Sequence, residues 1–396
     1  MFYFLFIFII ILLYILACAF LSRVMYKGEI SYYLPINVKK KSKKEGETEE
    51  EKMILIHDEF DEFTRRDTPV NYFSLFIGTF LFLLIKLLLS FCIAANLAKK
   101  LTKQLKEKKK KNEKLSKEEI QKNIESTKSH TTNFLRTSGI FYYKIRLPDE
   151  VVLPVYQKYF GKDYKIDYDG KFGCYICNHT SFNDILLAMA VYGCGFISKK
   201  GVKTFPVFGK IAQGLQTIFV DRDNPNSRRD VLEKVMERQK QFYEGEPVMP
   251  FMIFPEGTTT SGRHLLRFKK GAFFSLLPIK PNIVHPNLNK DFHLGCGSTD
   301  VGINYGRTLT KLYVVTEYIE LPIMTPNDYM FENFQNYGKE KWQIYAEVAR
   351  EIMCTLGGFS KSEKEFMDSY RYAYCMKKKI YIDKEEYMKV SEKNIE

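Results

Sequence analysis

Two long apolar segments dominate the first quarter of the chain. Residues 1–22 and 70–98 contain few polar side chains, and each is long enough, at about 1.5 Å per residue, to span a bilayer. Residues 17–19 (Ala-Cys-Ala) fit a signal-peptide cleavage pattern, but the apolar run continues past them, which favours a retained membrane anchor. Lys86, near the middle of the second segment, is compatible with a tilted or re-entrant helix as well as with a straight span.

Charged stretches flank the second apolar segment on both sides. Residues 23–69 are polar and mixed in charge, and blocks of like charge within them predict a solvated linker. Residues 99–131 are rich in Lys and are expected to be a tether, either an exposed helix or a disordered segment. Because positively charged flanks stay on the cytosolic side of a membrane, this block and the chain after it are expected in the cytosol.

From residue 132 onward, short apolar runs alternate with amphipathic stretches, which is typical of an α/β domain. We place this domain at 132–325, with a lead-in helix or strand at 134–146, and a helical region at 326–396. The helix at 228–243 is the best marked, because Ser227 can cap it and its apolar residues share one face. Strands are predicted at 172–177, 195–198, 217–220, 248–254, 279–284 and 312–319, and further helices at 182–192 and 265–276.

Polar residues follow two of these apolar runs where the predicted strands end. The first run leads into Asn-His-Thr-Ser-Phe-Asn-Asp, which places His179 five positions before Asp184. The second run leads into Pro-Glu-Gly-Thr at 255–258. Because the strands of an α/β sheet bring such loops to one edge, the two loops are expected to meet there. The pattern predicts a histidine base held by a carboxylate and facing a loop that can bind an anionic group.

Charge and cysteine usage narrow the classes of partner. The net charge is +13, and the chain also contains two segments apolar enough to enter a membrane. Binding to anionic lipid and phosphate groups therefore explains the charge more simply than binding to nucleic acid, for which no motif is present. Cys174 and Cys177 have the spacing of a metal or redox pair, but no second pair lies at ligand spacing. Residues i and i+3 of a strand also face opposite sides. We therefore expect reduced, buried thiols and no metal site.

Four ordered blocks of sequence carry a resemblance to a known family. They are residues 178–184 (NHTSFND), 217–222 (TIFVDR), 254–258 (FPEGT) and 278–281 (PIKP). In this order they resemble the glycerolipid acyltransferase family, and the segments 205–209 (FPVFG) and 268–273 (FKKGAF) make the lysophosphatidylcholine acyltransferases the closest likeness. The resemblance covers roughly 133–325. It implies a central mixed sheet flanked by helices, and transfer of a fatty acyl group from acyl-CoA to the free hydroxyl of a lysophospholipid.

The resemblance also implies residues that bind the phosphate of the acceptor. Arg222 offers a fork of donors for phosphate, although a surface salt bridge with a neighbouring Asp is the alternative role. Gly257 allows the backbone to come close to a ligand, whereas Glu256 cannot bind phosphate itself and is expected to organise the loop. The expected binding residues are Phe219, Arg222, Pro255, Glu256, Gly257 and Thr258.

Acyl transfer to a hydroxyl requires a base, and histidine is the side chain whose ordinary pKa suits that role near neutral pH. We assign His179 as the base and Asp184 as the partner that fixes its tautomer and steadies the imidazolium. The lysolipid hydroxyl then attacks directly. Ser181 lies in a loop without a nucleophile-elbow motif, so no acyl-enzyme is expected. Residues that could bind the phosphates of the donor, or equally be solvated cations, are Arg263, Lys269 and Lys270.

Two positions depart from the family pattern. Gln216 stands where the second block usually carries Gly, and Thr259 stands where the phosphatidate-forming enzymes usually carry Arg. The second departure favours a lysophospholipid with a headgroup over a bare phosphomonoester. Acylation of 1-acylglycerol-3-phosphate or glycerol-3-phosphate is the alternative within the enzyme class. A catalytically inactive lipid-binding membrane protein is the alternative outside it.

The expected partners and location follow from the anchor and the resemblance. Partners are acyl-CoA, a glycerolipid acceptor and membrane lipids, with no nucleic acid. Acyl-CoA is a substrate, so no cofactor is expected. The chain is expected in the endoplasmic reticulum membrane with its catalytic domain in the cytosol.

Overall fold

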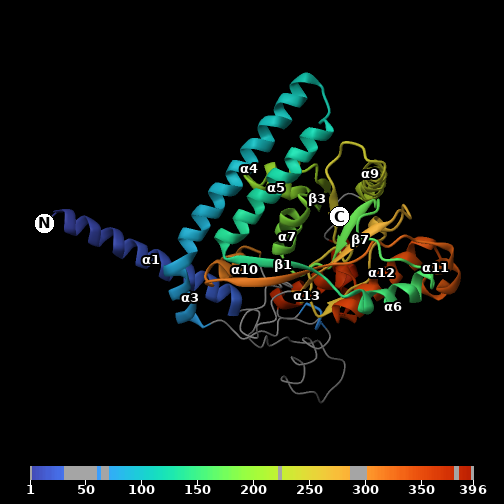
Figure 1. The fold of residues 1–396 in the computed structure, drawn as a ribbon. Coiled ribbons are helices and arrows are strands. Elements are labelled where there is room, and N and C mark those ends of the chain that lie inside the picture. The colour runs from blue at the N-terminus through green and yellow to red at the C-terminus, as the bar shows by residue number, and fades with distance from the viewer. Residues whose placement is uncertain are drawn as a thin grey trace, which may run out of the picture.

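A seven-stranded mixed sheet forms the centre of the fold in the computed structural model, which describes residues 2–30, 60–63, 71–221, 225–285, 301–378 and 383–393 (Figure 1). The strand order is β1-β8-β7-β2-β5-β3-β4, with β7 antiparallel to β8 and all other neighbours parallel. The predicted class, an α/β fold with a mixed sheet, is therefore confirmed. The strands are β1 (Ile140–Arg146), β2 (Cys174–Cys177), β3 (Gly195–Lys199), β4 (Ile218–Val220), β5 (Phe251–Ile253), β7 (Ile279–His285) and β8 (Val314–Glu320).

Alternating strand side chains face two layers of helices. One core contains Cys174, Ile176 and the buried residues of α6 (Asp149–Phe160) and α12 (Lys341–Gly357), with Val235 of α9 (Pro225–Tyr243). The other contains Cys177 and the buried residues of four helices. The two cysteines thus face opposite sides of the sheet, as period-2 alternation predicts. The helices of the second layer are α4 (Leu84–Lys111), α5 (Lys117–Ser138), α7 (Phe182–Tyr192) and α8 (Phe208–Gly214).

Smaller elements complete the described part of the chain. A second sheet pairs β6 (His264–Leu265) in parallel with β9 (Ser360–Lys361). The remaining elements are α10 (Val301–Leu309), α11 (Asp328–Asn333), α13 (Phe366–Lys378), α14 (Lys384–Lys393) and the short helices η2 (Lys200–Thr204), η3 (Lys270–Ala272) and η4 (Gln335–Tyr337).

The two apolar segments form helices that pack against each other and against the domain. The segments long and apolar enough to cross a membrane are Phe8–Lys27, in α1 (Phe2–Ile30), and Tyr72–Lys111, a continuous helix made of α3 (Tyr72–Gly78), the π-helical η1 (Thr79–Leu83) and α4. Both expose large apolar side chains, such as Phe8, Phe73 and Leu88, which are 62–70% exposed. The ammonium of Lys86 donates to the carbonyls of Lys311 and Leu312, so the domain itself satisfies this charge.

Of the two forms expected for the Lys-rich stretch at 99–131, an exposed helix or a disordered tether, the structure shows helix, and part of that helix is buried. These residues lie in α4 and α5, a long antiparallel helix pair that packs beside α7 (Figure 1). Leu101, Leu115 and Ile120 are buried in the second core, and Ser116 and Glu119 form a capping box that starts α5. The few apolar residues among the lysines are therefore core residues, while the long charged side chains extend to solvent.

Residues 60–63, inside the predicted solvated linker, are instead packed on the domain. Phe60 and Phe63 are 0% and 1% exposed, and the ring of Phe60 lies 5.3 Å from that of Tyr372 on α13. Asp61 forms ion pairs of 2.8 Å with Arg263 and His264. The blocks of like charge at 39–51 lie outside the described residues. At its start the linker is also shorter than predicted, because α1 continues to Ile30.

Local predictions were mostly correct for elements with a clear period. The helix at 182–192 is confirmed with the same bounds, and the helix predicted at 228–243 begins three residues earlier, at Pro225. The prediction of a helix at 265–276 is wrong. Leu265 is the last residue of β6, and the residues that follow it contain only the three-residue η3. The lead-in at 134–146 is divided between the end of α5 and the strand β1.

Candidate active site

The loop that follows β2 carries the predicted base. Asn178, which is 1% exposed, anchors the loop to β7: its amide nitrogen donates to the carbonyl of Val284 at 2.9 Å and its amide oxygen accepts the N–H of Val284 at 2.8 Å. The next residue is His179, whose Nδ1 lies 3.0 Å from Oδ2 of Asp184. The predicted pair is thus brought together at the carboxyl end of a buried central strand.

Asp184 is held as a preorganised carboxylate in the first turn of α7. Its Oδ2 accepts the backbone N–H groups of Thr180 and Ser181, the latter at 2.8 Å, and its Oδ1 accepts the hydroxyl of Thr180 at 3.1 Å. The side chain is 1% exposed. Its position near the helix N-terminus further favours negative charge. A buried acceptor at Nδ1 sets the tautomer in which Nδ1 carries the proton and Nε2 is the basic nitrogen.

His179 is confined on several sides. Its ring stacks on Phe254 with centroids 4.1 Å apart, and its carbonyl accepts the backbone N–H of Thr260 at 2.9 Å. The side chain remains 15% exposed. Among the described residues, no hydrogen-bond partner reaches Nε2, so this nitrogen can accept a proton from a bound molecule.

Glu256 lies beneath the base rather than at the surface of the site. It is 0% exposed, its Oε1 accepts the backbone N–H of His179 at 2.9 Å, and its Oε2 accepts that of Leu266 at 3.0 Å. Burial raises the pKa of Glu256 to about 8, although those two N–H groups and the charge of Arg350 lower it. With both oxygens bound to the backbone, Glu256 has the geometry of a residue that organises the loop.

The turn after Glu256 brings together backbone and cationic groups. Gly257 has φ +74°, and a Cβ at this position would lie 2.6 Å from the ammonium of Lys269. Lys269 also lies 3.8 Å over the ring of Phe366 on α13. Thr258 forms a hydroxyl–hydroxyl hydrogen bond of 3.1 Å with Ser369, also on α13. The bare backbone of Gly257, the Thr258 hydroxyl and the Lys269 ammonium form an arrangement that can bind an anion.

The other predicted site residues are more dispersed. Phe219 is half-buried in β4, and Pro255 is buried, with its carbonyl accepting the N–H of Lys269 at 2.9 Å. Arg222 lies outside the described residues. Arg263 is paired with Asp61, whereas Lys270 is exposed. Gln216, one of the two departures from the family pattern, has φ +55°, a left-handed backbone conformation that favours glycine.

Three residues that hold His179 in place were not predicted from the sequence as site residues. Asn178, Phe254 and Thr260 all fix the position of His179, yet none carries a chemical signature of a base or ligand. Asn178 and Phe254 are the first residues of the blocks 178–184 and 254–258, at the ends of their strands, and that placement is the signal that could have indicated them.

The segment that contains these loops is similar to known proteins. A family model described as Acyltransferase matches residues 167–285. The chain is 28% identical over 194 residues to the lysophosphatidylcholine acyltransferase of Drosophila melanogaster, which covers 49% of this chain and 34% of that protein. It is 29% identical over 201 residues to the lysophospholipid acyltransferase LPEAT1 of Arabidopsis thaliana, covering 50% and 48%. These matches therefore span less than half of either relative.

Two further comparisons concern smaller or more distant proteins. The 1-acyl-sn-glycerol-3-phosphate acyltransferase of Neisseria gonorrhoeae is 39% identical over 100 residues, which cover 25% of this chain and 37% of that protein. Among solved structures, the 1-acyl-sn-glycerophosphate acyltransferase PlsC from Thermotoga maritima matches with a TM-score of 0.36 and 16% identity, over 58% of this chain and 76% of that one. By its motifs and its family match, the chain contains an Acyltransferase family domain at residues 167–285.

Proposed function

We propose that this protein transfers a fatty acyl group from acyl-CoA to the free hydroxyl of a lysophospholipid, with lysophosphatidylcholine or a related lysolipid as the acceptor. The observation that carries the proposal is the His179–Asp184 pair, with Nδ1 and Oδ2 3.0 Å apart and Nε2 left for a substrate. The named activities of the relatives support lysolipid acylation. Thr259, in place of Arg, favours an acceptor that carries a headgroup.

The proposed reaction is a direct transfer between the two substrates. Nε2 of His179 removes the proton of the acceptor hydroxyl as its oxygen attacks the thioester carbonyl. The tetrahedral intermediate collapses, the C–S bond breaks, and the thiolate of CoA receives the proton from the imidazolium. Asp184 stabilises the imidazolium while it exists, as a carboxylate does in a catalytic triad. Ser181 is 1% exposed and caps α7, so its role in this scheme is structural.

The loop at 257–258 is proposed to bind the phosphate of the acceptor. The hydroxyl of Thr258 and the ammonium of Lys269 would be its donors, with Arg222 as a further one, and Gly257, which has no side chain, would let the phosphate approach the turn. A phosphate at this loop would lie close to the carbonyl oxygen of His179, because Thr260 joins the two loops by its backbone N–H. Binding the acceptor here brings its hydroxyl within reach of the base, and such positioning is a large part of catalysis.

We also propose that the second apolar helix lies along one face of the membrane instead of crossing it, with the domain in the cytosol. Residues 60–63 precede this helix and dock on the domain that follows it, so both ends lie on one side. Lys86 contacts domain carbonyls from the middle of the helix, and residues 94–101 are packed in the core. The lysines that follow favour the cytosolic side, and the endoplasmic reticulum is the membrane we propose.

Labelled acyl-CoA and a panel of acceptors test the proposed reaction. The panel contains lysophosphatidylcholine, lysophosphatidylethanolamine, 1-acylglycerol-3-phosphate and glycerol-3-phosphate, offered to membranes that contain the protein. Preferred acylation of a lysolipid with a headgroup supports the proposal. Preference for 1-acylglycerol-3-phosphate would replace it with the activity named for the Neisseria relative, and preference for glycerol-3-phosphate would replace it with glycerol-3-phosphate acylation. Lipid binding without turnover would replace it with a non-enzymatic role.

A further inference from the structure

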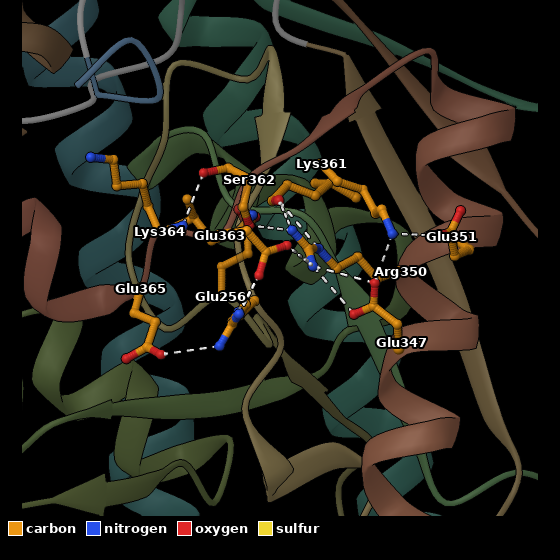
Figure 2. A network of polar contacts seen from close by, with 12 residues as sticks. Glu256, Glu347, Arg350, Glu351, Lys361, Ser362, Glu363, Lys364 and Glu365 are labelled. Carbon is orange, nitrogen blue, oxygen red and sulfur yellow. Dashed lines mark hydrogen bonds and ion pairs between the residues drawn. The ribbon is translucent and has the colours of Figure 1, made fainter. Parts of the chain in front are cut away.

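Arg350 is a fully buried charge outside the segment that matches the family. It lies on α12, is 1% exposed, and follows the matched segment by more than sixty residues. Removing a guanidinium from water costs several kcal/mol unless its donors are satisfied. Figure 2 shows Arg350 at the centre of a polar network, with Glu347, Ser362 and Glu363 around it and Glu256 in the same view.

The guanidinium binds the strand that supports Glu256. Nη2 and Nε both donate to the carbonyl of Leu265, at 3.0 and 3.3 Å, and Nη2 also donates to the carbonyl of Ser362. The same Leu265 carbonyl accepts the N–H of Ser362 at 3.0 Å. Arg350 thereby joins the β6 and β9 segments at one point. Nη2 contacts both carbonyls, and the rigid guanidinium adds a second donor, Nε, to the carbonyl of Leu265.

A short chain of contacts leads from Arg350 to the base. Leu265 is followed by Leu266, whose N–H donates to Glu256 at 3.0 Å, and the other oxygen of Glu256 accepts the N–H of His179 at 2.9 Å. Leu265, Leu266 and Glu256 are each at most 1% exposed, so water does not compete for these bonds. The positive charge of Arg350 also lowers the pKa of Glu256, which favours the carboxylate that accepts both N–H groups.

We propose that Arg350 is a positioning residue for acyl transfer, which holds the Leu265–Leu266 segment against Glu256 and, through Glu256, fixes the backbone of His179. The inference rests on the proposed function, and it extends the site to a C-terminal helix. The charged and titratable groups that face Glu256 are His179, Asp184, Arg350, Cys177 and Cys354. Among these, Arg350 is the permanent cation.

Substitutions at Arg350 separate positioning from general stability. Arg350→Met removes the fork and the charge, and Arg350→Lys keeps the charge alone. Arg307→Met is the matched control, because Arg307 is also 1% exposed but lies on α10. We expect Arg350→Met to lower kcat about 10- to 100-fold with little change in KM, as for a misplaced catalytic group. In Arg350→Met, the rise of kcat with pH on the acidic side of the profile should move to higher pH, because the charge that lowers the pKa of Glu256 is lost. Arg350→Lys keeps this charge, so the rise should stay at its wild-type pH and part of kcat should return.

A double-mutant cycle with Glu256→Gln tests the route of the effect. If Arg350 acts through Glu256, Arg350→Met should lower kcat less than about threefold in the Glu256→Gln background. The proposal would be overturned if the fold decrease in kcat of the double variant equalled the product of the decreases in the two single variants. So would an Arg307→Met variant that shifts the pH profile in the same way.

Amide hydrogen exchange gives a readout that needs no turnover. Peptides that contain His179 and Leu266 should exchange faster in Arg350→Met than in the wild type or Arg307→Met, in protein that remains folded by thermal melting. Unchanged exchange at both amides would overturn the positioning role. If the wild type acylates no acceptor while the exchange difference is present, the proposed function fails, but the positioning of His179 by Arg350 through Glu256 is supported.

Discussion

The carboxylate of Glu256 accepts the backbone N–H of His179 at 2.9 Å, although 77 residues separate them in the chain. The bond connects the loop after β5 to the loop after β2. It places a buried carboxyl directly behind the base, while Asp184 binds the imidazole ring. One carboxylate therefore orients the side chain of His179 and the other orients its backbone.

Replacing Glu256 by Gln should destabilise the protein and lower activity. Above about pH 8, where the carboxyl of Glu256 is ionised, the amide NH₂ of Gln would instead face the N–H of His179 or of Leu266, which leaves one buried donor without an acceptor. Such a loss costs about 1–3 kcal/mol. Denaturant unfolding and acyl-transfer assays on the same preparation would check this. Wild-type stability in the variant would mean that these two bonds are not formed in the protein.

The raised pKa of Glu256 should make stability depend on pH. The carboxyl titrates near 4.5 in the unfolded chain and at about 8 in the folded one. Between these values the folded protein binds more protons, so the free energy of unfolding should fall as pH rises from about 5 to 8, by on the order of a few kcal/mol. Unfolding curves of the wild type and Glu256→Gln measure this contribution by difference. A difference that stays constant over this pH range would refute it.

Ser181→Ala distinguishes capping from nucleophilic catalysis. The hydroxyl of Ser181 accepts the N–H of Asn183 at 3.1 Å at the start of α7, and loss of such a cap costs about 1 kcal/mol. We expect a lower melting temperature and a rate that falls less than about tenfold, because the base and its partner remain. Abolished turnover, together with an acyl group found on Ser181 of the wild type by mass spectrometry, would establish a covalent mechanism instead.

Gly257→Ala should weaken binding of the acceptor. Gly257 has φ +74° and its added Cβ would displace the Lys269 ammonium, whereas Gly245, with φ +75°, has open space around it. Both substitutions should cost about 1–2 kcal/mol in stability for the left-handed backbone. Only Gly257→Ala should raise the KM for the acceptor, by about tenfold for a lost contact of 1.4 kcal/mol. An equal rise in KM for Gly245→Ala would show that strain alone is responsible.

The docked segment at 60–63 predicts the side of the membrane on which the linker lies. An N-glycosylation acceptor inserted in the linker between the two apolar helices should remain unmodified if, as proposed, the linker lies with the domain in the cytosol. An epitope at the same position should be accessible under conditions that expose the C-terminus. Glycosylation of the linker in an active protein would contradict this topology.

The sequence predicts those parts of the site that are local in the chain. His179 and Asp184 lie five positions apart, and the strand and helix that hold them have clear periods, so their pairing could be inferred. The contacts of Glu256 with His179 and of Arg350 with Leu265 could not, because they join side chains to backbone atoms of distant segments. A backbone partner leaves no pattern of residue types in the sequence.

Errors in the predicted elements have related causes. The helix expected at 265–276 fails because β6 pairs with β9, nearly a hundred residues later, and this tertiary pairing overrides local propensity. Around α4 and α5, charge density suggested a solvated tether, yet Leu101 and Ile120 are buried. A few apolar residues at helical spacing can hold a helix on a core even when lysines surround them.

The most direct test of the account is acyl transfer by wild type and His179→Ala at equal protein level in membranes. The base contributes on the order of 10²–10⁴ in rate. The wild type should acylate a lysophospholipid from acyl-CoA, and this turnover should fall by such a factor in the variant. Turnover that survives in His179→Ala would contradict it, because the proton would then leave the acceptor by another route.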